Sequence, residues 1–448
     1  MGKNIVIIGA GEVGYNLAKS LSKSDFEITV IDIDPIKCLR VKENIDAQIL
    51  EGDGGSQRLL QNIDMEKVDF LLALTRIDEV NLVASRISHK MGAKKIICRL
   101  RNTEYQHKDA VITPEQFGID YVTYPEKAAK DEIELLIRQS STAEVHKFKD
   151  GQITLVGIQL ESSSPLIGRT VMSVELANPF VPHKLVVVNR NEKTFVPHQS
   201  TRYQKDDIAY FIGKSSDIDK IQKIAGKPSI DVNNIMILGA GKIGRLLSKS
   251  LHADYNVRLI EKNIEKAKRV SNDHPGILLL TGSGTDIEFL ESENISEVDC
   301  FIAATESEQK NILTGILAKD LGAKQVIVHI TTTSYLPAVR HIGVDAIVSK
   351  NISAVNEVIK YIRSDKSYLI SRFEDIDIES LELTVPPDSN FTRKKYTVDK
   401  IPEDIALGAI IRNGKTIIPD LNTHIQPHDD LIVFTKEESI NKAENLFK

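Results

Sequence analysis

The chain has 448 residues, of which 41% are hydrophobic and 27% are charged, and its formal net charge is -6. This length allows three or four domains of ordinary size, and the composition is typical of a globular protein that dissolves in water. A net negative charge argues against a broad nucleic-acid-binding surface, because phosphate backbones are bound by basic stripes. No nucleic-acid partner is therefore expected.

We expect a cytoplasmic protein without membrane spans. No apolar run approaches the length needed to cross a bilayer, and the N-terminus leads directly into a predicted strand, without a signal peptide. The three cysteines, Cys38, Cys98 and Cys300, lie in or beside apolar runs and form no CxxC pair. They are predicted to be buried thiols in a reducing compartment. The scattered histidines lack the spacing of metal ligands, so no metal site is predicted.

Predicted strands and helices alternate over the first part of the chain. Short apolar runs at Ile5–Ile8, Ile28–Ile31, Phe70–Leu74 and Lys95–Cys98 are typical of strands that are covered on both faces. Val13–Ser22, between the first two runs, is predicted to be a helix. Strands that alternate with helices indicate βαβ units and a parallel sheet.

A helix is predicted at Glu126–Arg138, where apolar residues recur at helical spacing. After it the pattern changes to strands, which are predicted at Thr154–Leu160, Lys184–Asn189 and Ile208–Ile212. The chain thus passes from an α/β domain into a small β-rich domain.

The second half of the chain repeats the first. Met1–Leu21 and Asp231–Leu251 have the same residue at 11 of 21 positions. Later matches pair Thr75…Asn81 with Thr305…Asn311, Gly92–Lys94 with Gly322–Lys324, Arg190–Thr194 with Arg412–Thr416, and Asp206-Asp207 with Asp429-Asp430. The corresponding later elements are a helix at Ser353–Arg363 and strands at Ser380–Val385, Ala409–Arg412 and Asp430–Phe434. A unit this long is no solenoid repeat and indicates a duplicated two-domain module.

The predicted fold class is therefore α/β. Two Rossmann-like parallel-sheet domains are each followed by a small β-rich α+β domain, in tandem duplication. The four domains are expected at residues 1–140, 141–228, 229–365 and 366–448.

A glycine fingerprint follows the first predicted strand and opens a helix. Gly9 permits a tight turn, Gly11 lets the backbone approach a pyrophosphate, and Gly14 lets the helix pack on the strand. The helix N-terminus presents free N–H groups to phosphates. The fingerprint recurs in the second half, and the candidate phosphate loops are Gly9, Ala10, Gly11, Glu12, Val13 and Gly14, and Gly239, Ala240, Gly241, Lys242, Ile243 and Gly244.

An acidic residue ends the second predicted strand of each copy. Asp32 lies about twenty residues beyond the first glycines, where a carboxylate binds ribose hydroxyls, and Glu261 takes the same place in the second copy. An acid here favours NAD over NADP, because it repels a 2′-phosphate. ADP or ATP also satisfies a fingerprint for pyrophosphate and ribose, so the nucleotide stays open.

These motifs, in this order, resemble those of the TrkA family, the peripheral subunits of Trk potassium uptake systems, which carry tandem RCK modules. The residues that carry the resemblance are the glycine starts, the strand-end acids, Gly52-Asp53-Gly54 and Thr75–Asn81, followed by a β-rich domain. The resemblance covers nearly the whole chain. It implies RCK_N and RCK_C domains in each module, binding of NAD(H) and of ATP or ADP, and no catalysis.

The resemblance also implies assembly and site residues. A ring, expected to be a homotetramer, would dock on the pore-forming Trk-type subunit at the inner face of the membrane, and the helices at Glu126–Arg138 and Ser353–Arg363 would cross to a neighbouring module. Asp53 and Thr75 would surround the nucleoside, and Arg99 would reach phosphates. The second-copy counterparts are Ser283 and Thr305.

The two copies differ at candidate site positions. Ser283 replaces Asp53, Glu308-Gln309 replaces Asp78-Glu79, and His329 occupies the region of Arg99. Because a guanidinium pairs well with phosphate oxygens, the first site is expected to bind phosphates more strongly.

Other interpretations remain open. Asp32 is alternatively a solvated acid at a strand end, Arg99 an exposed loop arginine, and Asp53 a turn former. At the level of function, an NAD-dependent oxidoreductase is the main alternative, although no acid–base constellation stands out beside the cofactor fold. A nucleotide sensor of a different transporter is the third interpretation.

Overall fold

The computed structural model describes residues 3–22, 26–107, 109–191, 193–273, 276–340, 342–363, 370–372, 378–394 and 396–447. The chain separates into two compact units. Unit 1 contains Met1–Asp131, Thr331–Ser334 and Val348–Ile362, and unit 2 contains Glu132–Ile330, Tyr335–Ile347 and Arg363–Lys448. Unit 1 therefore combines the start of the chain with two short segments from its second half. The expected domain boundary at 365/366 lies outside the described residues.

The first parallel sheet has six strands in the order β3-β2-β1-β4-β5-β6. Its strands are β1 Lys3–Ile8, β2 Phe26–Asp32, β3 Gln48–Glu51, β4 Phe70–Ala73, β5 Lys95–Arg99 and β6 Tyr121–Thr123. The connecting helices are α1 Glu12–Leu21, α2 Pro35–Asn44, α3 Gln57–Leu60 and α4 Asp78–Lys90, and α5 Pro125–Arg138 follows the last strand. The predicted strands and helices of this region are confirmed, and the strand order is that of a Rossmann-like sheet.

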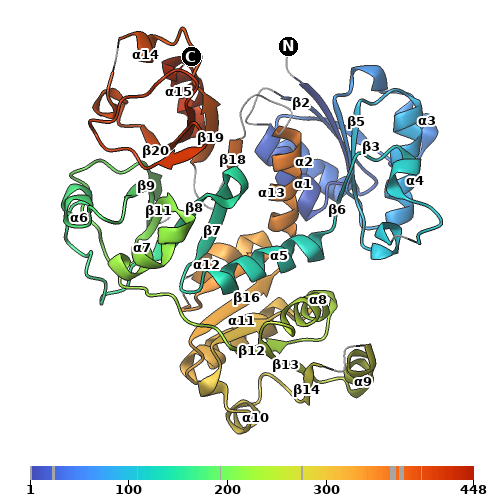
Figure 1. Cartoon of the computed structure of the whole chain (residues 1–448). Coiled ribbons are helices and arrows are strands. Elements are labelled where there is room, and N and C mark those ends of the chain that lie inside the picture. Colours follow the sequence, from blue (N-terminus) through green and yellow to red (C-terminus); the bar gives the residue numbers. More distant parts are fainter. Residues whose placement is uncertain are drawn as a thin grey trace. The chain divides into compact units, whose positions relative to one another are not determined.

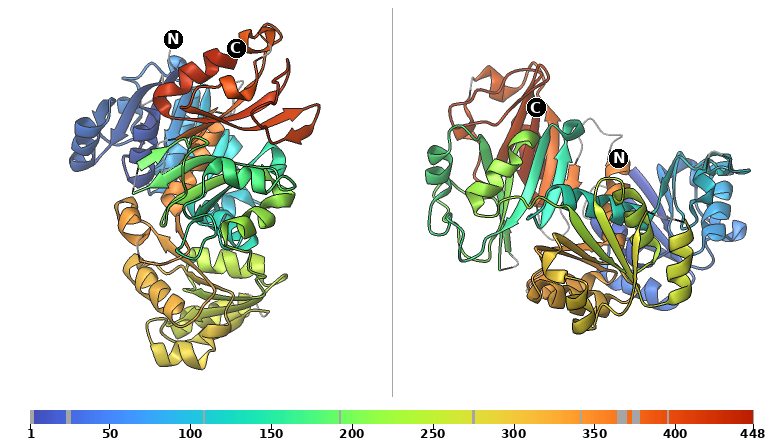
Figure 2. Two further views of the ribbon diagram at one scale, coloured as in Figure 1. Left: turned by 90° about the vertical axis from the view of Figure 1, so that its left-hand side faces the viewer. Right: turned by 60° about the horizontal axis from the view of Figure 1, so that its bottom comes forward.

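A second six-stranded parallel sheet repeats this order as β14-β13-β12-β15-β16-β17. Its strands are β12 Asn234–Leu238, β13 Asn256–Glu261, β14 Leu278–Thr281, β15 Cys300–Ala303, β16 Gln325–Ile330 and β17 Ala346–Ser349. Its helices are α8 Lys242–Leu251, α9 Ile264–Asp273, α10 Ile287–Ser292, α11 Glu308–Asp320, α12 Leu336–Arg340 and α13 Lys350–Arg363. Figure 2 shows the yellow and orange strands with helices on both faces of this sheet.

Two five-stranded sheets make up the β-rich parts, with the orders β10-β9-β11-β8-β7 and β18-β19-β22-β20-β21. The first comprises β7 Glu144–Phe148, β8 Ile153–Gln159, β9 His183–Arg190, β10 Lys193–Phe195 and β11 Ile208–Lys214, with helices α6 Val171–Ala177 and α7 Ile218–Ala225. The second comprises β18 Ile370–Arg372, β19 Glu379–Thr384, β20 Ile405–Arg412, β21 Lys415–Ile417 and β22 Asp430–Thr435, with α14 Asn390–Arg393 and α15 Ile440–Phe447. Neighbouring strands pair antiparallel in both sheets.

Each antiparallel sheet contains an equivalent arginine–aspartate ion pair. Arg190 donates from Nε and Nη2 to Asp207 at 2.7 and 2.8 Å, and Arg412 donates to Asp429 at 2.8 Å from both nitrogens. Asp207 thus corresponds to Asp429. The sequence match of Asp206-Asp207 with Asp429-Asp430 was wrong by one residue. Because each copy has two adjacent aspartates, the sequences of the two copies could be aligned in either of two ways.

The two antiparallel sheets share a core within unit 2. Phe148, Leu155 and Tyr210 of the first sheet cluster with buried side chains of the second, including Ile432 and Phe434. Beside this core, Lys149 forms ion pairs with Glu382 at 3.4 Å and Asp430 at 3.3 Å. Burial of this apolar surface is the main force that holds the two β-rich parts together.

Helix α13 packs into the first Rossmann-like domain although it follows the last strand of the second. Ala354, Val355 and Val358 lie in the same buried cluster as strand and helix residues of the first domain, among them Ile7 and Leu17. Figure 1 shows the orange helix α13 beside the blue α1. The expectation that this helix crosses to a neighbouring module is confirmed.

Polar contacts fix the register of α13. The carboxylate of Glu357 accepts hydrogen bonds from Tyr121 Oη at 2.8 Å and from Thr123 Oγ1 at 2.7 Å, at the end of β6. The ring of Tyr361 stacks on Tyr121 with 4.4 Å between centroids. Helix α5 crosses in the same way, since its last part belongs to unit 2, where Gln325 Nε2 of β16 donates to the carbonyl of Leu136 at 3.3 Å.

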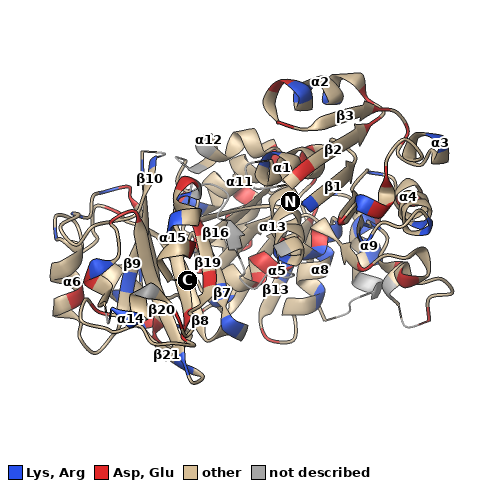
Figure 3. Ribbon diagram, turned by 90° about the horizontal axis from the view of Figure 1, so that it is seen from above, with Lys and Arg blue, Asp and Glu red and all other residues tan. Residues whose placement is uncertain are grey.

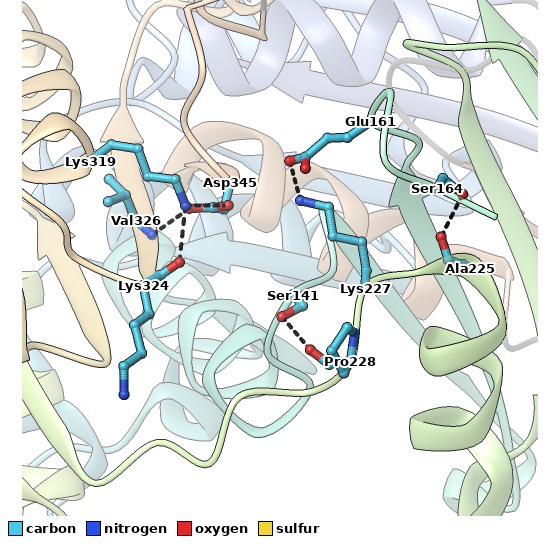
Figure 4. A network of polar contacts seen from close by, with 10 residues as sticks. All are labelled: Ser141, Glu161, Ser164, Ala225, Lys227, Pro228, Lys319, Lys324, Val326 and Asp345. Atoms are coloured by element: carbon cyan, nitrogen blue, oxygen red, sulfur yellow. Dashed lines mark hydrogen bonds and ion pairs between the residues drawn. The ribbon is translucent and has the colours of Figure 1, made fainter. Parts of the chain in front are cut away.

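The link between α7 and β12 is anchored on the residues after α5 (Figure 4). Ser141 Oγ donates to the carbonyl of Pro228 at 2.9 Å, and Lys227 forms an ion pair with Glu161. The buried Ser140 hydroxyl donates to the carbonyl of Ile230 at 2.8 Å. These contacts give this stretch of chain a defined path.

The three cysteines are buried and free, as the sequence predicted. Burial raises the pKa of the Cys98 thiol to about 12 and also raises the pKa of Cys38 and Cys300. None of the helices within the described ranges is long and apolar enough to cross a membrane.

We expect Glu357→Ala to destabilise unit 1, because the hydroxyls of Tyr121 and Thr123 lose their acceptor. Loss of such a partner costs about 1–3 kcal/mol. Thermal unfolding followed by circular dichroism should give a lower Tm than for Glu79→Ala, which removes an exposed glutamate from α4. Equal Tm values for the two variants would contradict a stabilising role for Glu357.

Candidate functional site

The conformation of each candidate phosphate loop requires glycine at two of its three glycine positions. Gly9 has a φ of +104°, which favours glycine, and a Cβ at Gly14 would lie 1.8 Å from the carbonyl oxygen of Gly9. In the second copy Gly239 also has a φ of +104°, and the distance from a Cβ at Gly244 to its oxygen is 1.9 Å. The turn and the close helix therefore require glycine at these four positions.

Nothing in the fold requires glycine at the middle position of each fingerprint, Gly11 or Gly241. A Cβ at Gly11 would meet no atom within 4 Å, and one at Gly241 would come no closer than 3.9 Å to the carbonyl oxygen of Ala304. The φ values of Gly11 and Gly241 are -67° and -71°, which any residue adopts. A glycine here leaves open space directly before the helix.

The helices that start at these glycines carry no side-chain cap. Gly11 precedes α1 and Gly241 precedes α8, whereas α2 is capped by Asp34 and α11 by Ser307. Without a capping side chain, the first amides of α1 and α8 remain available to an anion at the positive end of the helix dipole.

The strand-end acids hold the loops. Asp32 accepts a hydrogen bond from the Ala10 amide at 2.6 Å with one oxygen and from the Asp34 amide at 2.9 Å with the other. Glu261 binds the Ala240 and Asn263 amides in the same way, at 3.0 and 2.8 Å. Asp32 is only 8% exposed, so the alternative of a solvated acid is wrong.

A buried asparagine, for which no role was predicted, joins the ends of β4 and β5. Asn81 accepts from the Thr75 amide at 2.9 Å and from its hydroxyl at 2.7 Å, and it donates to the Arg99 carbonyl at 2.8 Å. Asn311 makes the same bonds to Thr305 and to the carbonyl of His329. Thr75 and Thr305 are thereby fixed at the sheet edge next to the glycine loops, and the repeated asparagine was the available signal.

Asp53 and Ser283 lie in the turns after β3 and β14. Asp53 is exposed, and its carboxylate accepts from the Gly55 amide at 2.9 Å, so the turn-forming role is present. Ser283 Oγ lies 2.9 Å from Thr285 Oγ1. Neither contact prevents a role at the nucleoside, and neither requires one.

Arg99 is the last residue of β5 and is half-buried, so the alternative of an exposed loop arginine is wrong. Its Nε atom is inaccessible and has no hydrogen-bond partner. Burial lowers the pKa of its guanidinium; Glu126 opposes this shift, whereas Arg101 and Arg76 add to it. The positive charges of Arg76 and Arg101 therefore act on the Arg99 guanidinium at the ends of β4 and β5.

This arginine cluster is confined to the first copy. The aligned positions of the second copy hold Glu306, His329 and Thr331. Like charges that lie together favour an anionic occupant. Arg76 was missed from the sequence because it approaches Arg99 only where the ends of β4 and β5 meet, and Arg101, two positions after Arg99, was not singled out.

Two buried acidic residues, Asp78 and Glu126, lie beside the arginines. Asp78 is buried and accepts from the amides of Arg101 and Asn102 at 2.8 to 3.0 Å. Glu126, also buried, forms an ion pair with Lys350 of α13 at 3.5 Å. In the second copy, Asn351 takes the place of Glu126. The opposite charges of Arg99 and Glu126 are thus replaced by His329 and the uncharged Asn351.

Comparison with known proteins gives matches over the full length. The TrkA-N domain matches residues 5–125 and 235–350, and the TrkA-C domain matches residues 155–226 and 381–448. The Trk system potassium uptake protein TrkA homolog of Archaeoglobus fulgidus is 31% identical over 447 residues, which cover 99% of this chain and 100% of the relative. The Trk system potassium uptake protein TrkA of Vibrio alginolyticus is 26% identical over 450 residues, with coverage of 99% and 98%.

Solved structures support the same fold. The GsuK channel has a TM-score of 0.59 at 14% identity, with 99% of this chain and 79% of that chain covered. The GsuK channel bound to NAD has a TM-score of 0.58 at 15% identity, with 100% and 79% covered.

We expect Gly14→Ala to destabilise the first Rossmann-like domain, whereas Gly11→Ala should not. The methyl group at position 14 would collide with the Gly9 carbonyl oxygen, and such overpacking costs about 1–3 kcal/mol. Thermal unfolding should give a lowered Tm for Gly14→Ala and a near wild-type Tm for Gly11→Ala. If Gly11→Ala were the more destabilised variant, the space assigned to position 11 would be wrong.

Proposed function

The chain belongs to the TrkA family, and on that premise we propose that it is the nucleotide-binding regulatory subunit of a Trk-type potassium uptake system. The subunit binds NAD(H), ATP or ADP and changes conformation between ligands, which gates a pore-forming membrane protein. It is cytoplasmic, peripheral at the inner face of the membrane through this partner, and homotetrameric. It gates without consuming the nucleotide.

The observation that carries nucleotide binding is the open space at Gly11, in front of an uncapped helix. The fold itself requires glycine at positions 9 and 14 but not at 11. A ligand whose phosphate lies against the backbone would require glycine at position 11, because a side chain there would block its approach. The same open space at Gly241 supports a second site. In GsuK, the structures bound to NAD and to ADP are consistent with both ligand classes.

The proposal assigns roles by position. In the first module, the loop from Gly9 to Gly14 binds the pyrophosphate, Asp32 the ribose, Asp53 and Thr75 the nucleoside, and Arg99 the phosphates. In the second module, the corresponding residues are Gly239 to Gly244, Glu261, Ser283 and Thr305. These sites lie in the domains proposed at 1–140 and 229–365, and the domains at 141–228 and 366–448 complete the modules.

The two sites have different ligand preferences in this proposal. Arg76, Arg99 and Arg101 favour a highly charged nucleotide such as ATP at the first site. The second site has Glu306 in place of Arg76, and this acid repels a terminal phosphate. We therefore expect ATP to bind more tightly at the first site than at the second.

Titration calorimetry on the full chain tests these assignments. Gly11→Ala should weaken nucleotide binding at the first site at least tenfold, because the methyl group fills the phosphate approach, and should leave the second site intact. Gly241→Ala is the matched control, which should weaken nucleotide binding at the second site and leave the first site intact. Tighter ATP binding in Gly11→Ala than in Gly241→Ala would contradict the assignment of the ATP-preferring site to the first module.

Two further measurements separate this function from its alternatives. Potassium flux in vesicles that contain the Trk-type pore subunit of the same genome should depend on added protein and nucleotide. Flux that ignores both would favour the sensor of a different transporter. Sustained NADH oxidation across a panel of carbonyl substrates would favour the oxidoreductase.

A further inference from the structure

The first nucleotide site includes a residue from the second half of the chain. Glu12 is the first residue of α1, and both of its carboxylate oxygens have partners within unit 1. Arg40 Nη1 donates to Oε1 at 3.1 Å, and Thr333 Oγ1 donates to Oε2 at 3.4 Å. Thr333 follows β16 and is 321 positions away from Glu12 along the chain.

Arg40 is itself fixed in place. Its guanidinium lies over the ring of Tyr15 at 3.8 Å from the centroid, and Tyr15 is buried in α1. Figure 3 shows basic residues on α2, the helix that carries Arg40. One oxygen of Glu12 is thus held by a cation whose own position is restricted.

Thr333 is positioned by α13. Asn351 Nδ2 donates to the carbonyl of Thr331 at 2.9 Å, and Asn351 is 5% exposed. Helix α13 in turn packs into the core of the first Rossmann-like domain through Ala354 and Val355. The hydroxyl of Thr333 therefore approaches Glu12 from a segment that is anchored in unit 1.

Glu12 lies where the proposed phosphate binds, at the uncapped N-terminus of α1. A carboxylate repels a phosphate there, unless other groups neutralise it and keep it in place. The second copy has Lys242 at this position, so its loop has no acid to neutralise. The need for a partner such as Thr333 is specific to the first site.

We propose that Thr333 is a positioning residue of the first nucleotide site. Its hydroxyl and the guanidinium of Arg40 hold the carboxylate of Glu12, so that a nucleoside polyphosphate or dinucleotide is tolerated at the end of α1. Phosphate affinity at the first site then depends on residues 331–334, which the second module supplies. This inference rests on the nucleotide-binding function proposed above.

The test is ATP affinity in the full-length protein, measured by calorimetry. Thr333→Val removes the hydroxyl and should weaken ATP binding at the first site about three- to tenfold, which corresponds to the loss of one hydrogen bond of ordinary strength. Thr333→Ser retains the hydroxyl and should restore wild-type affinity. Thr103→Val changes the aligned, exposed residue of the first copy and should have no effect.

A double-mutant cycle shows whether Thr333 acts through Glu12. Glu12→Gln should tighten ATP binding, and in that background Thr333→Val should change nothing, because no charge remains to be held. The inference is overturned if Thr333→Val leaves affinity unchanged, or weakens it equally in both backgrounds. Wild-type protein that binds no adenine nucleotide would overturn the proposed function itself.

Discussion

The close contact between α1 and the turn before it is the constraint on which the site depends. Gly14 faces the Gly9 carbonyl with no room for a side chain, and Asp32 holds the Ala10 amide at 2.6 Å. A hydrogen bond to a charged acceptor contributes about 1.5–3 kcal/mol. Together these contacts fix the helix end before any ligand arrives, so little ordering remains for binding. Both modules keep the same arrangement, with Glu261 in the acid's place.

The candidate sites of the two modules share this backbone arrangement but differ in charge. Asn81 and Asn311 tie the same strand ends together, so the backbone at the sheet edge is preserved in both copies. The charges differ, because the first copy has Glu12 and three arginines where the second has Lys242, Glu306, His329 and Thr331. Duplication therefore conserved the framework and changed the electrostatics of the ligand position. Two ligands can regulate through such a pair only if their affinities differ between conformations.

Much of the fold could be predicted from the sequence, because its strongest signals are local. Apolar runs such as Ile28–Ile31 and the helix at Glu126–Arg138 follow simple periodicity, and the duplication supported each prediction twice. The strands that were missed are short or lie at sheet edges. β3 is half-exposed and only four residues long, and β10 has three residues. Such segments lack a burial pattern that distinguishes them from loops.

The candidate site was predicted in part for a related reason. The glycines and Asp32 form a motif with fixed spacing, so the sequence alone located them. Arg76 and Thr333 belong to the candidate site through tertiary structure, since another strand end and a crossing segment bring them there. A ribose role for Asp32 was predicted from its position, whereas its hydrogen bond to the Ala10 amide was not. Burial and backbone partners are properties of the folded chain, and no sequence motif with a fixed spacing indicates them.

Amide hydrogen exchange of the full-length protein, followed by mass spectrometry with and without ATP, tests the central claim most directly. If phosphates are bound by the amides at the start of α1, ATP should slow exchange in peptides that cover Gly9 to Tyr15, beyond the protection the fold already provides. ATP that binds while exchange at Gly9 to Tyr15 stays unchanged, with protection only in the β-rich domains, would contradict the account.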